Sequence, residues 1–166
     1  MSDSLRTATT LLVLSALLVA AAVWGWSAAT ESLPGKVDQA VCVDTEVSAG
    51  ERLYPQQVTV SVYNASNRSG LAGRTMRALR DRGFSAGSVG DVRAKVGRAA
   101  VWSTDPSSPA VQLVTAHLGR RGDVERREGL GPGVTVVVGD RFGNLAKGAS
   151  FVEVAEDATI CSPPVG

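Results

Sequence analysis

The hydrophobic and polar positions of this chain change their spacing several times, and the longest apolar stretch comes first. The 24 residues 7–30 carry no charge. At about 1.5 Å per residue, a helix of that length covers about 36 Å, enough to cross the hydrocarbon core of a membrane. Trp24 and Trp26 lie at its far end, where indole rings favour the membrane–water boundary. The pattern therefore predicts a transmembrane signal-anchor helix.

The orientation of this helix follows from its flanking charge. Arg6 is the one basic residue before it, which favours a cytoplasmic N-terminus over residues 1–6 and an extracytoplasmic body. A cleaved signal peptide is the alternative, with the small residues Ser27-Ala28-Ala29 as the cleavage site. In both interpretations the rest of the chain leaves the cytoplasm.

Beyond residue 56, the spacing of apolar residues alternates between two and about 3.6 positions, which predicts alternating strands and helices. The order β-α-β-β-α-β-β favours an α+β fold, specifically a ferredoxin-like sandwich with both helices on one face. A doubly wound sheet would need strict alternation, whereas two strands follow each other here. The predicted elements of this order are strands 57–63, 84–92, 99–103, 123–127 and 134–138, and helices 71–82 and 105–118. Residues 151–154 could add one more strand after them.

Composition shifts divide the extracytoplasmic part into three segments. Residues 31–56 are polar and contain prolines, which predicts a linker; residues 57–142 form the folded domain, and residues 143–166 a C-terminal extension. Cys42 and Cys161 bracket the domain, and outside the cytoplasm such a pair favours a disulfide. Lipid attachment at Cys42 is the alternative, although the residues before it are not typical of a lipoprotein cleavage site. No CxxC spacing supports a redox or metal role.

Charge and composition narrow the possible functions. The net charge is +1, whereas nucleic-acid-binding domains are usually strongly basic. The single histidine, His117, has no second histidine or evident nucleophile near it in sequence, so it is predicted to be a packed residue. The acidic residues form no recognisable pair. The sequence therefore predicts no catalytic residue, no metal site, no cofactor and no nucleic-acid partner.

Basic residues gather in one part of the chain. Residues 68–98 contain eight Lys or Arg and two Asp, a local charge of +6, which suits an anionic polymer or lipid headgroups but also a solvated helix face. Loop amides and hydroxyls could bind sugars, and the free N–H groups of a helix start favour an anion. Alternatively, these polar groups only satisfy the turn. The candidate ligand-binding residues are Asn64, Ser66, Asn67, Arg68, Gly70, Arg74 and Arg77.

Several motifs occur in a familiar order. The segment 58–66 (VTVSVYNAS) is followed by Gly70-Leu71-Ala72, by Gly83-Phe84 and by the segment 136–142 (VVVGDRF). In this order they resemble the C-terminal domain of the LytR/CpsA/Psr family over residues 57–142. Ala65 departs from the glycine usual in the first turn.

The resemblance implies a role in the cell envelope. Full-length relatives also carry a catalytic domain that transfers polyprenyl-linked polymers to peptidoglycan, and the 26 residues between the predicted membrane helix and the first strand leave no room for it. The chain looks like the stand-alone, membrane-anchored form common in actinobacteria. We therefore expect a non-enzymatic envelope protein that binds cell-wall glycopolymer or peptidoglycan, or that scaffolds LytR/CpsA/Psr transfer enzymes or copies of itself. The alternatives are a hydrolase or transferase acting on the same polymers and a structural dimerisation module.

Overall fold

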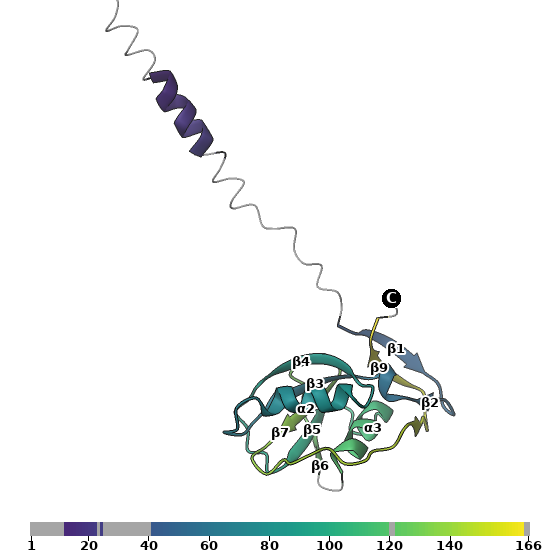
Figure 1. Ribbon diagram of the computed structural model, residues 1–166. Helices are drawn as coiled ribbons and strands as arrows, with labels where there is room; N and C mark the ends of the chain where they lie inside the picture. Colours follow the sequence, from purple (N-terminus) through teal and green to yellow (C-terminus); the bar gives the residue numbers. More distant parts are fainter. Residues whose placement is uncertain (1–11, 23, 25–40, 120–121, 165–166) are drawn as a thin grey trace, which may run out of the picture. The chain divides into compact units, whose positions relative to one another are not determined.

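The computed structural model describes residues 12–22, 24, 41–119 and 122–164 (Figure 1). The chain separates into two compact units, residues 1–39 and residues 40–166. In the first unit, residues 12–22 and 24 are helical. Among the described residues, no helix is both long enough and apolar enough to cross a membrane. The predicted cytoplasmic segment 1–6 and half of the predicted anchor 7–30 lie outside the described residues.

The second unit contains all of the strands in the described part of the chain. A mixed five-stranded sheet has the order β4-β3-β7-β5-β6, and two short ladders pair β1 with β9 and β2 with β8. The elements are β1 (Val43–Val47), β2 (Arg52–Leu53), η1 (Pro55–Gln57), β3 (Thr59–Asn64), α2 (Leu71–Arg80), β4 (Ser85–Asp91), β5 (Ala99–Ser103), α3 (Pro109–Leu118), β6 (Gly122–Arg126), β7 (Val134–Val138), β8 (Val152–Glu153) and β9 (Ala158–Ser162).

The α+β prediction is confirmed, but the strand order differs from a ferredoxin-like sandwich. In that fold, the two strands of each βαβ unit are separated by another strand. Here β3 lies directly beside β4, and β5 directly beside β6, with both pairs parallel. β7 joins the two units, parallel to β3 and antiparallel to β5. All five residues of β7 are buried, so it takes the central position, whereas the glycine-containing β4 is partly exposed and lies at an edge.

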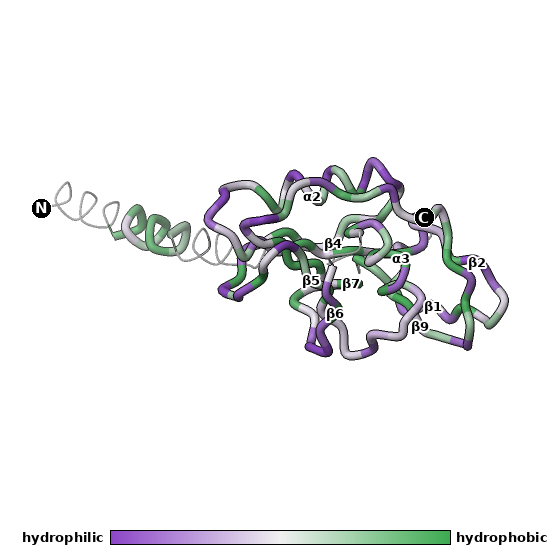
Figure 2. Tube along the Cα trace, turned by 90° about the horizontal axis from the view of Figure 1, so that it is seen from below, coloured by the Kyte–Doolittle hydropathy of each residue, from purple (hydrophilic) through white to green (hydrophobic). Residues whose placement is uncertain are grey.

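Both helices cover one face of the sheet, as predicted. The main core packs α2 and α3 against inward-facing valines such as Val60, Val101 and Val136. The opposite face carries a smaller cluster around Trp102 and Val137, over which the apolar side chains between residues 92 and 96 pack. Figure 2 shows that the chain around β5 and β7 is mainly hydrophobic and that polar segments lie at the periphery.

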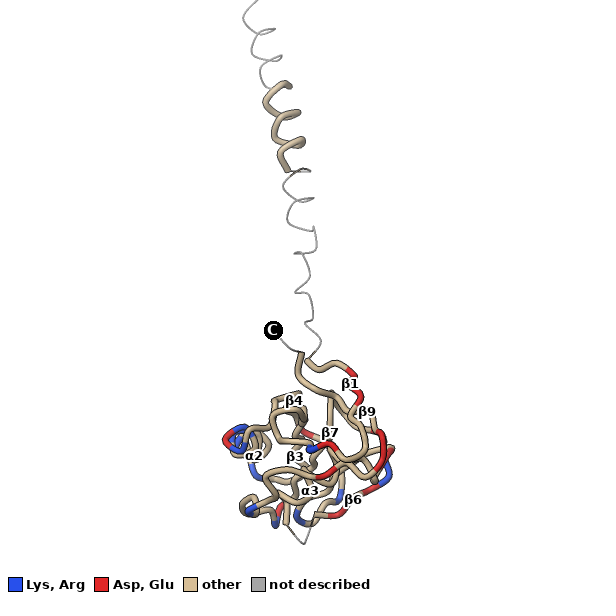
Figure 3. Tube along the Cα trace, turned by 90° about the vertical axis from the view of Figure 1, so that its right-hand side faces the viewer, with Lys and Arg blue, Asp and Glu red and all other residues tan. Residues whose placement is uncertain are grey.

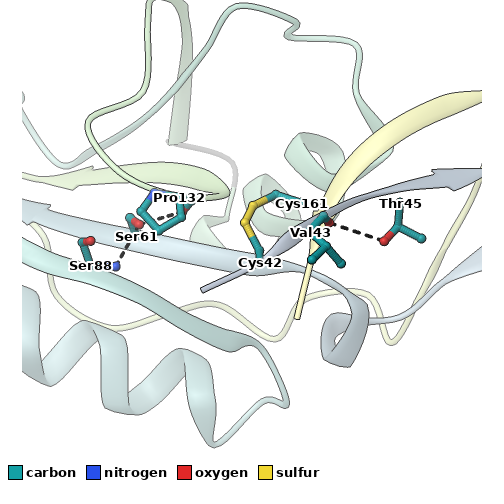
Figure 4. Close-up of a disulfide and its surroundings, with 7 residues drawn as sticks. All are labelled: Cys42, Val43, Thr45, Ser61, Ser88, Pro132 and Cys161. Atoms are coloured by element: carbon teal, nitrogen blue, oxygen red, sulfur yellow. Dashed lines mark hydrogen bonds between the residues drawn. A yellow bond between two sulfur atoms is a disulfide. The ribbon is translucent and has the colours of Figure 1, made fainter. Parts of the chain in front are cut away.

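The two ends of the domain are tied together by a disulfide and a strand ladder. Cys42 and Cys161 are bonded, with their Cα atoms 5.3 Å apart and a sequence separation of 119 residues (Figure 4). The predicted disulfide is confirmed. The ladder also extends the domain into the segment predicted as a linker, where Val47 and Leu53 are buried in the main core. The folded part therefore begins before residue 57.

Candidate binding site

α2 is amphipathic, and its polar face carries the cations of the region. Its buried residues point to the sheet, while Arg74, Arg77 and Arg80 are exposed. Gly70 precedes the helix with φ of 70°, a left-handed conformation that glycine adopts without steric cost. Figure 3 shows the Lys and Arg segments around α2.

Asn64, at the end of β3, organises the loop that leads to this helix. Its Oδ1 accepts hydrogen bonds from the backbone N–H of Ser66 (3.0 Å) and from the Ser66 hydroxyl (2.6 Å). Its Nδ2 donates to the Arg68 carbonyl (3.2 Å) and to a carboxylate oxygen of Asp91 (3.1 Å). The side chain is also only 7% exposed. Both ends of the amide are therefore used within the protein, where they fix the shape of the loop.

The same loop is tied to the segment that follows β7. The backbone N–H of Asn67 donates to Oδ1 of Asp140 (3.0 Å). Nη1 of Arg68 donates to the carbonyl oxygens of Phe142 (2.5 Å) and Asp140 (3.4 Å). These bonds hold the Arg68 guanidinium in place beside residues 142–145.

Three arginines gather around a cavity of about 340 Å³ between α2 and residues 142–145. Arg74 donates from Nη1 to the Ser69 carbonyl (3.1 Å), and Arg82 from Nη1 to the Ala78 carbonyl (2.8 Å). Each guanidinium has five N–H donors, so most remain available to a ligand. Among the described residues, no carboxylate lines this cavity. Its lining consists of Arg68, Leu71, Arg74, Thr75, Ala78, Arg82, Phe142, Gly143, Asn144 and Leu145.

The structure divides the sequence-predicted residues among three places. Arg68 and Arg74 share the cavity just described. Arg77 lies with Arg80 and Asp81 at another hollow. A third hollow, of about 370 Å³, is lined by residues 64–67 and 91–94, among them Asn64, Ser66 and Asn67.

Sequence reasoning missed Arg82, although a signal was present. Arg74, Ala78 and Arg82 follow one another at intervals of four, which places them along one line of a helix. The small side chain of Ala78 leaves room between the two arginines, and it lines the cavity with them.

A second cavity of about 740 Å³ adjoins the first and shares Arg82 and Leu145 with it. We call the two together the basic groove. Lys147 adds a further cation, and among the described residues no Asp or Glu lines this part either. Its lining consists of Tyr54, Pro55, Gln56, Arg82, His117, Leu145, Lys147, Gly148, Ala149 and Ser150.

His117, at the floor of the second cavity, is packed as predicted. It is 5% exposed, and its Nε2 lies 3.0 Å from the Ala149 carbonyl, which makes Nε2 the protonated nitrogen. Phe84 meets the ring edge-to-face at 5.0 Å, and Nδ1 is buried without a hydrogen-bond partner. Burial lowers the pKa of His117, and Arg82 lowers it further, while the bond to Ala149 partly opposes both. The neutral ring therefore holds residues 146–149 against α3.

The described residues contain no group of three or more His, Cys, Asp or Glu side chains suited to a metal ion. The region instead combines fixed arginines, backbone amides and one exposed tyrosine, which is suited to binding anions and hydroxyl groups.

Comparison with known sequences places this architecture in a family. Residues 57–142 match the family described as LytR cell envelope-related transcriptional attenuator. The chain belongs to this family. The match confirms the resemblance found in the sequence, and it assigns the LytR C-terminal domain to this chain with a cell-envelope-related role.

One solved structure is similar to this LytR C-terminal domain protein. It is the soluble domain of a conserved hypothetical secreted protein from Mycobacterium marinum, with a TM-score of 0.42 and 22% sequence identity. The similarity covers 60% of this chain and 78% of that chain. Comparison with curated proteins finds no match.

Proposed function

We propose that this LytR C-terminal domain is a non-enzymatic module that binds anionic cell-wall glycopolymer, with the basic groove as its binding site. The observation that carries this proposal is the set of three arginines around one cavity with no carboxylate among the described lining residues. An acidic polymer would supply the missing negative charge.

The chemistry of the groove favours phosphate or carboxylate groups. A guanidinium binds these groups through two parallel N–H···O bonds, which are stronger than neutral hydrogen bonds. Arg68, Arg74 and Arg82 are each held by at least one bond to a backbone carbonyl, so less side-chain entropy is lost when a ligand binds.

Two observations support an extracytoplasmic, membrane-anchored position. The uncharged stretch 7–30 is long enough to cross a membrane if it is helical throughout. The disulfide between Cys42 and Cys161 is typical of an oxidising compartment outside the cytoplasm. The domain would then stand close to the membrane surface, facing the polymers that are attached to peptidoglycan.

A charge-matched pair of double variants of the full-length chain tests the site. Arg74→Gln with Arg82→Gln removes two cations from the groove, whereas Arg77→Gln with Arg80→Gln removes two from the same helical region at another hollow. The probes are purified cell-wall sacculi and poly(glycerol phosphate). At low ionic strength, we expect the groove pair to weaken retention by about a hundredfold or more, because each of the two lost charge-assisted bonds is worth about 1.5–3 kcal/mol and about 1.4 kcal/mol is tenfold. The control pair should change it less than about twofold, as expected for exposed charges.

The same experiment can contradict the proposal in two ways. Equal losses in both double variants would indicate general attraction to a basic surface rather than a defined groove. New soluble fragments released from the sacculi would show turnover, and the hydrolase or transferase alternative would then replace the binding module.

A further inference from the structure

We infer that the second cavity of the basic groove is a saccharide subsite, in which the Tyr54 ring stacks on a sugar of the bound polymer. This inference rests on the proposed function, because it names the chemical class that the second half of the same groove recognises. The first cavity would hold the anionic group, and the second the ring that carries or adjoins it.

The two cavities adjoin each other at two shared lining residues. Arg82 and Leu145 line both, so the Arg82 guanidinium is placed to contact a ligand in either cavity. The second cavity is the larger of the two, at about 740 Å³ against 340 Å³. A bare phosphate would fill little of it, whereas a sugar ring with its substituents suits that space.

Tyr54 is exposed, and contacts with its neighbours fix its position. The side chain is 42% exposed, although Tyr54 is the residue that caps the start of η1. Its backbone N–H donates to Oε1 of Gln57 (2.9 Å), and its ring lies 5.8 Å from the ring of Phe151. The guanidinium of Arg52 lies 4.8 Å from the centre of that second ring. An aromatic ring that packs on a neighbour and keeps one edge in solvent is typical of recognition surfaces. It offers apolar contact area, and little side-chain conformational entropy is lost when a ligand binds.

The groups around the tyrosine match the polar part of a sugar. Gln56 contributes an amide, and Arg82 and Lys147 contribute donors for hydroxyl, carboxylate or phosphate oxygens. Residues 145–150 also line the cavity, and two hydrogen bonds with His117 fix them. The Ala146 N–H donates to the His117 carbonyl (2.7 Å), and Nε2 of His117 donates to the Ala149 carbonyl (3.0 Å). One aromatic face beside convergent polar groups is the composition expected of a subsite for a charged glycan.

The test compares Tyr54→Leu with Tyr54→Phe in the full-length chain. One probe is a neutral oligomer of N-acetylglucosamine, which has rings without charge, and the other is poly(glycerol phosphate), which has charge without rings. We expect Tyr54→Leu to weaken binding of the neutral oligomer about three- to tenfold, the range for loss of an aromatic contact. Tyr54→Phe, which keeps the ring, should bind it as the parent does, and both variants should bind the phosphate polymer normally.

Backbone NMR shifts of Gln56 and Lys147 on addition of the neutral oligomer provide a readout that needs no variant to fold. Shifts at both residues are expected. If the parent does not bind the neutral oligomer, or if Tyr54→Leu binds it equally well, the saccharide subsite is wrong while phosphate-polymer binding leaves the proposed function intact. If neither probe binds, the proposed function fails together with the subsite.

Discussion

The two βαβ units of the sheet share a topology but differ in what covers their helices. In the first unit, β3-α2-β4, five of the ten residues of α2 are buried and its outer face carries arginines. In the second, β5-α3-β6, seven of the ten residues of α3 are buried, including His117. Residues 146–149 pack on the end of α3 through that histidine. One helix therefore presents charge to solvent, while the other anchors the C-terminal segment that forms the far wall of the groove.

This difference predicts that the two helices have separate roles, with α2 contributing to ligand binding and α3 to the stability of the fold. Substitution of Arg74, the arginine of α2 that lines the groove, should change ligand affinity with little effect on folding, because exposed charges contribute little to stability. Substitutions in α3 should act mainly on folding, and on the groove only through the wall that α3 holds. Four predictions test this division.

The largest effect is expected from Leu113→Ala in α3. Leu113 is fully buried in the main core, and truncating such a side chain costs about 2–5 kcal/mol through lost burial and the cavity left behind. The free energy of unfolding from urea titration measures this effect. Arg80→Ala, at an exposed position of α2, is the control and should change it by less than about 0.5 kcal/mol. Similar losses in the two variants would contradict the division.

Gly148→Ala should break the contact between α3 and the C-terminal segment. A Cβ at Gly148 would collide with the His117 ring, so the segment must shift, at a cost of about 1–3 kcal/mol. Gly143→Ala is a matched control in the same segment, because its Cβ would meet open space. Thermal unfolding and proteolysis of residues 143–150 measure the effect, and equal behaviour of the two variants would show that the wall is not held by this contact.

Acidification should destabilise the protein through His117. The pKa of His117 in the folded state lies below its ordinary value of 6.5, mainly because of burial. The unfolded state therefore binds a proton more readily, and stability falls as the pH drops below about 6.5 toward the folded-state pKa. His117→Gln keeps a donor for the Ala149 carbonyl and should flatten this part of the curve of unfolding free energy against pH. A parent curve without that slope would contradict the assignment.

The smallest effect is expected at Asp105, in the turn before α3. Hydrogen bonds from the side chain and backbone of Ser107 lower the pKa of Asp105 below its ordinary value of 3.8. The charged form thus stabilises the fold above that pH, and this contribution is lost as the pH falls through the folded-state pKa. Because Asp105 is exposed, solvent screening should limit the loss in Asp105→Asn at neutral pH to less than about 1 kcal/mol. The variant should also lose less stability than the parent below pH 4, which urea titrations at both pH values measure.

Elements whose bounds are determined by neighbouring residues in the sequence were predicted more accurately than those that depend on distant parts of the chain. The bounds of β5 and β7 were predicted correctly, because each is a short apolar run between polar or glycine-containing segments. The start of α3 was placed too early: the Asp105 carboxylate bonds the N–H and hydroxyl of Ser107 in a separate turn, so that the helix begins at Pro109.

Features that depend on distant partners were not predicted. β1 and β9 carry polar residues and form strands only because they pair with each other across the length of the domain. The central place of β7 likewise depends on two neighbours from different parts of the chain. At the site, Arg68 and Arg74 were identified as basic residues near a helix start. The spacing of four aligns Arg82 with Arg74, but the cavity that the two share exists only because residues 142–145 fold back over α2.

The disulfide that closes the domain also determines how the domain would respond to mechanical force. Cys42 is where the chain enters the folded part, and Cys161 lies beside its exit, so a pull applied at the two ends is transmitted through the sulfur bridge. The sheet, α2 and the basic groove lie inside the covalent loop and would bear none of that tension. A protein tethered at one end and loaded at the other could therefore keep its ligand while stretched, and would unravel under the same load once the bridge is reduced.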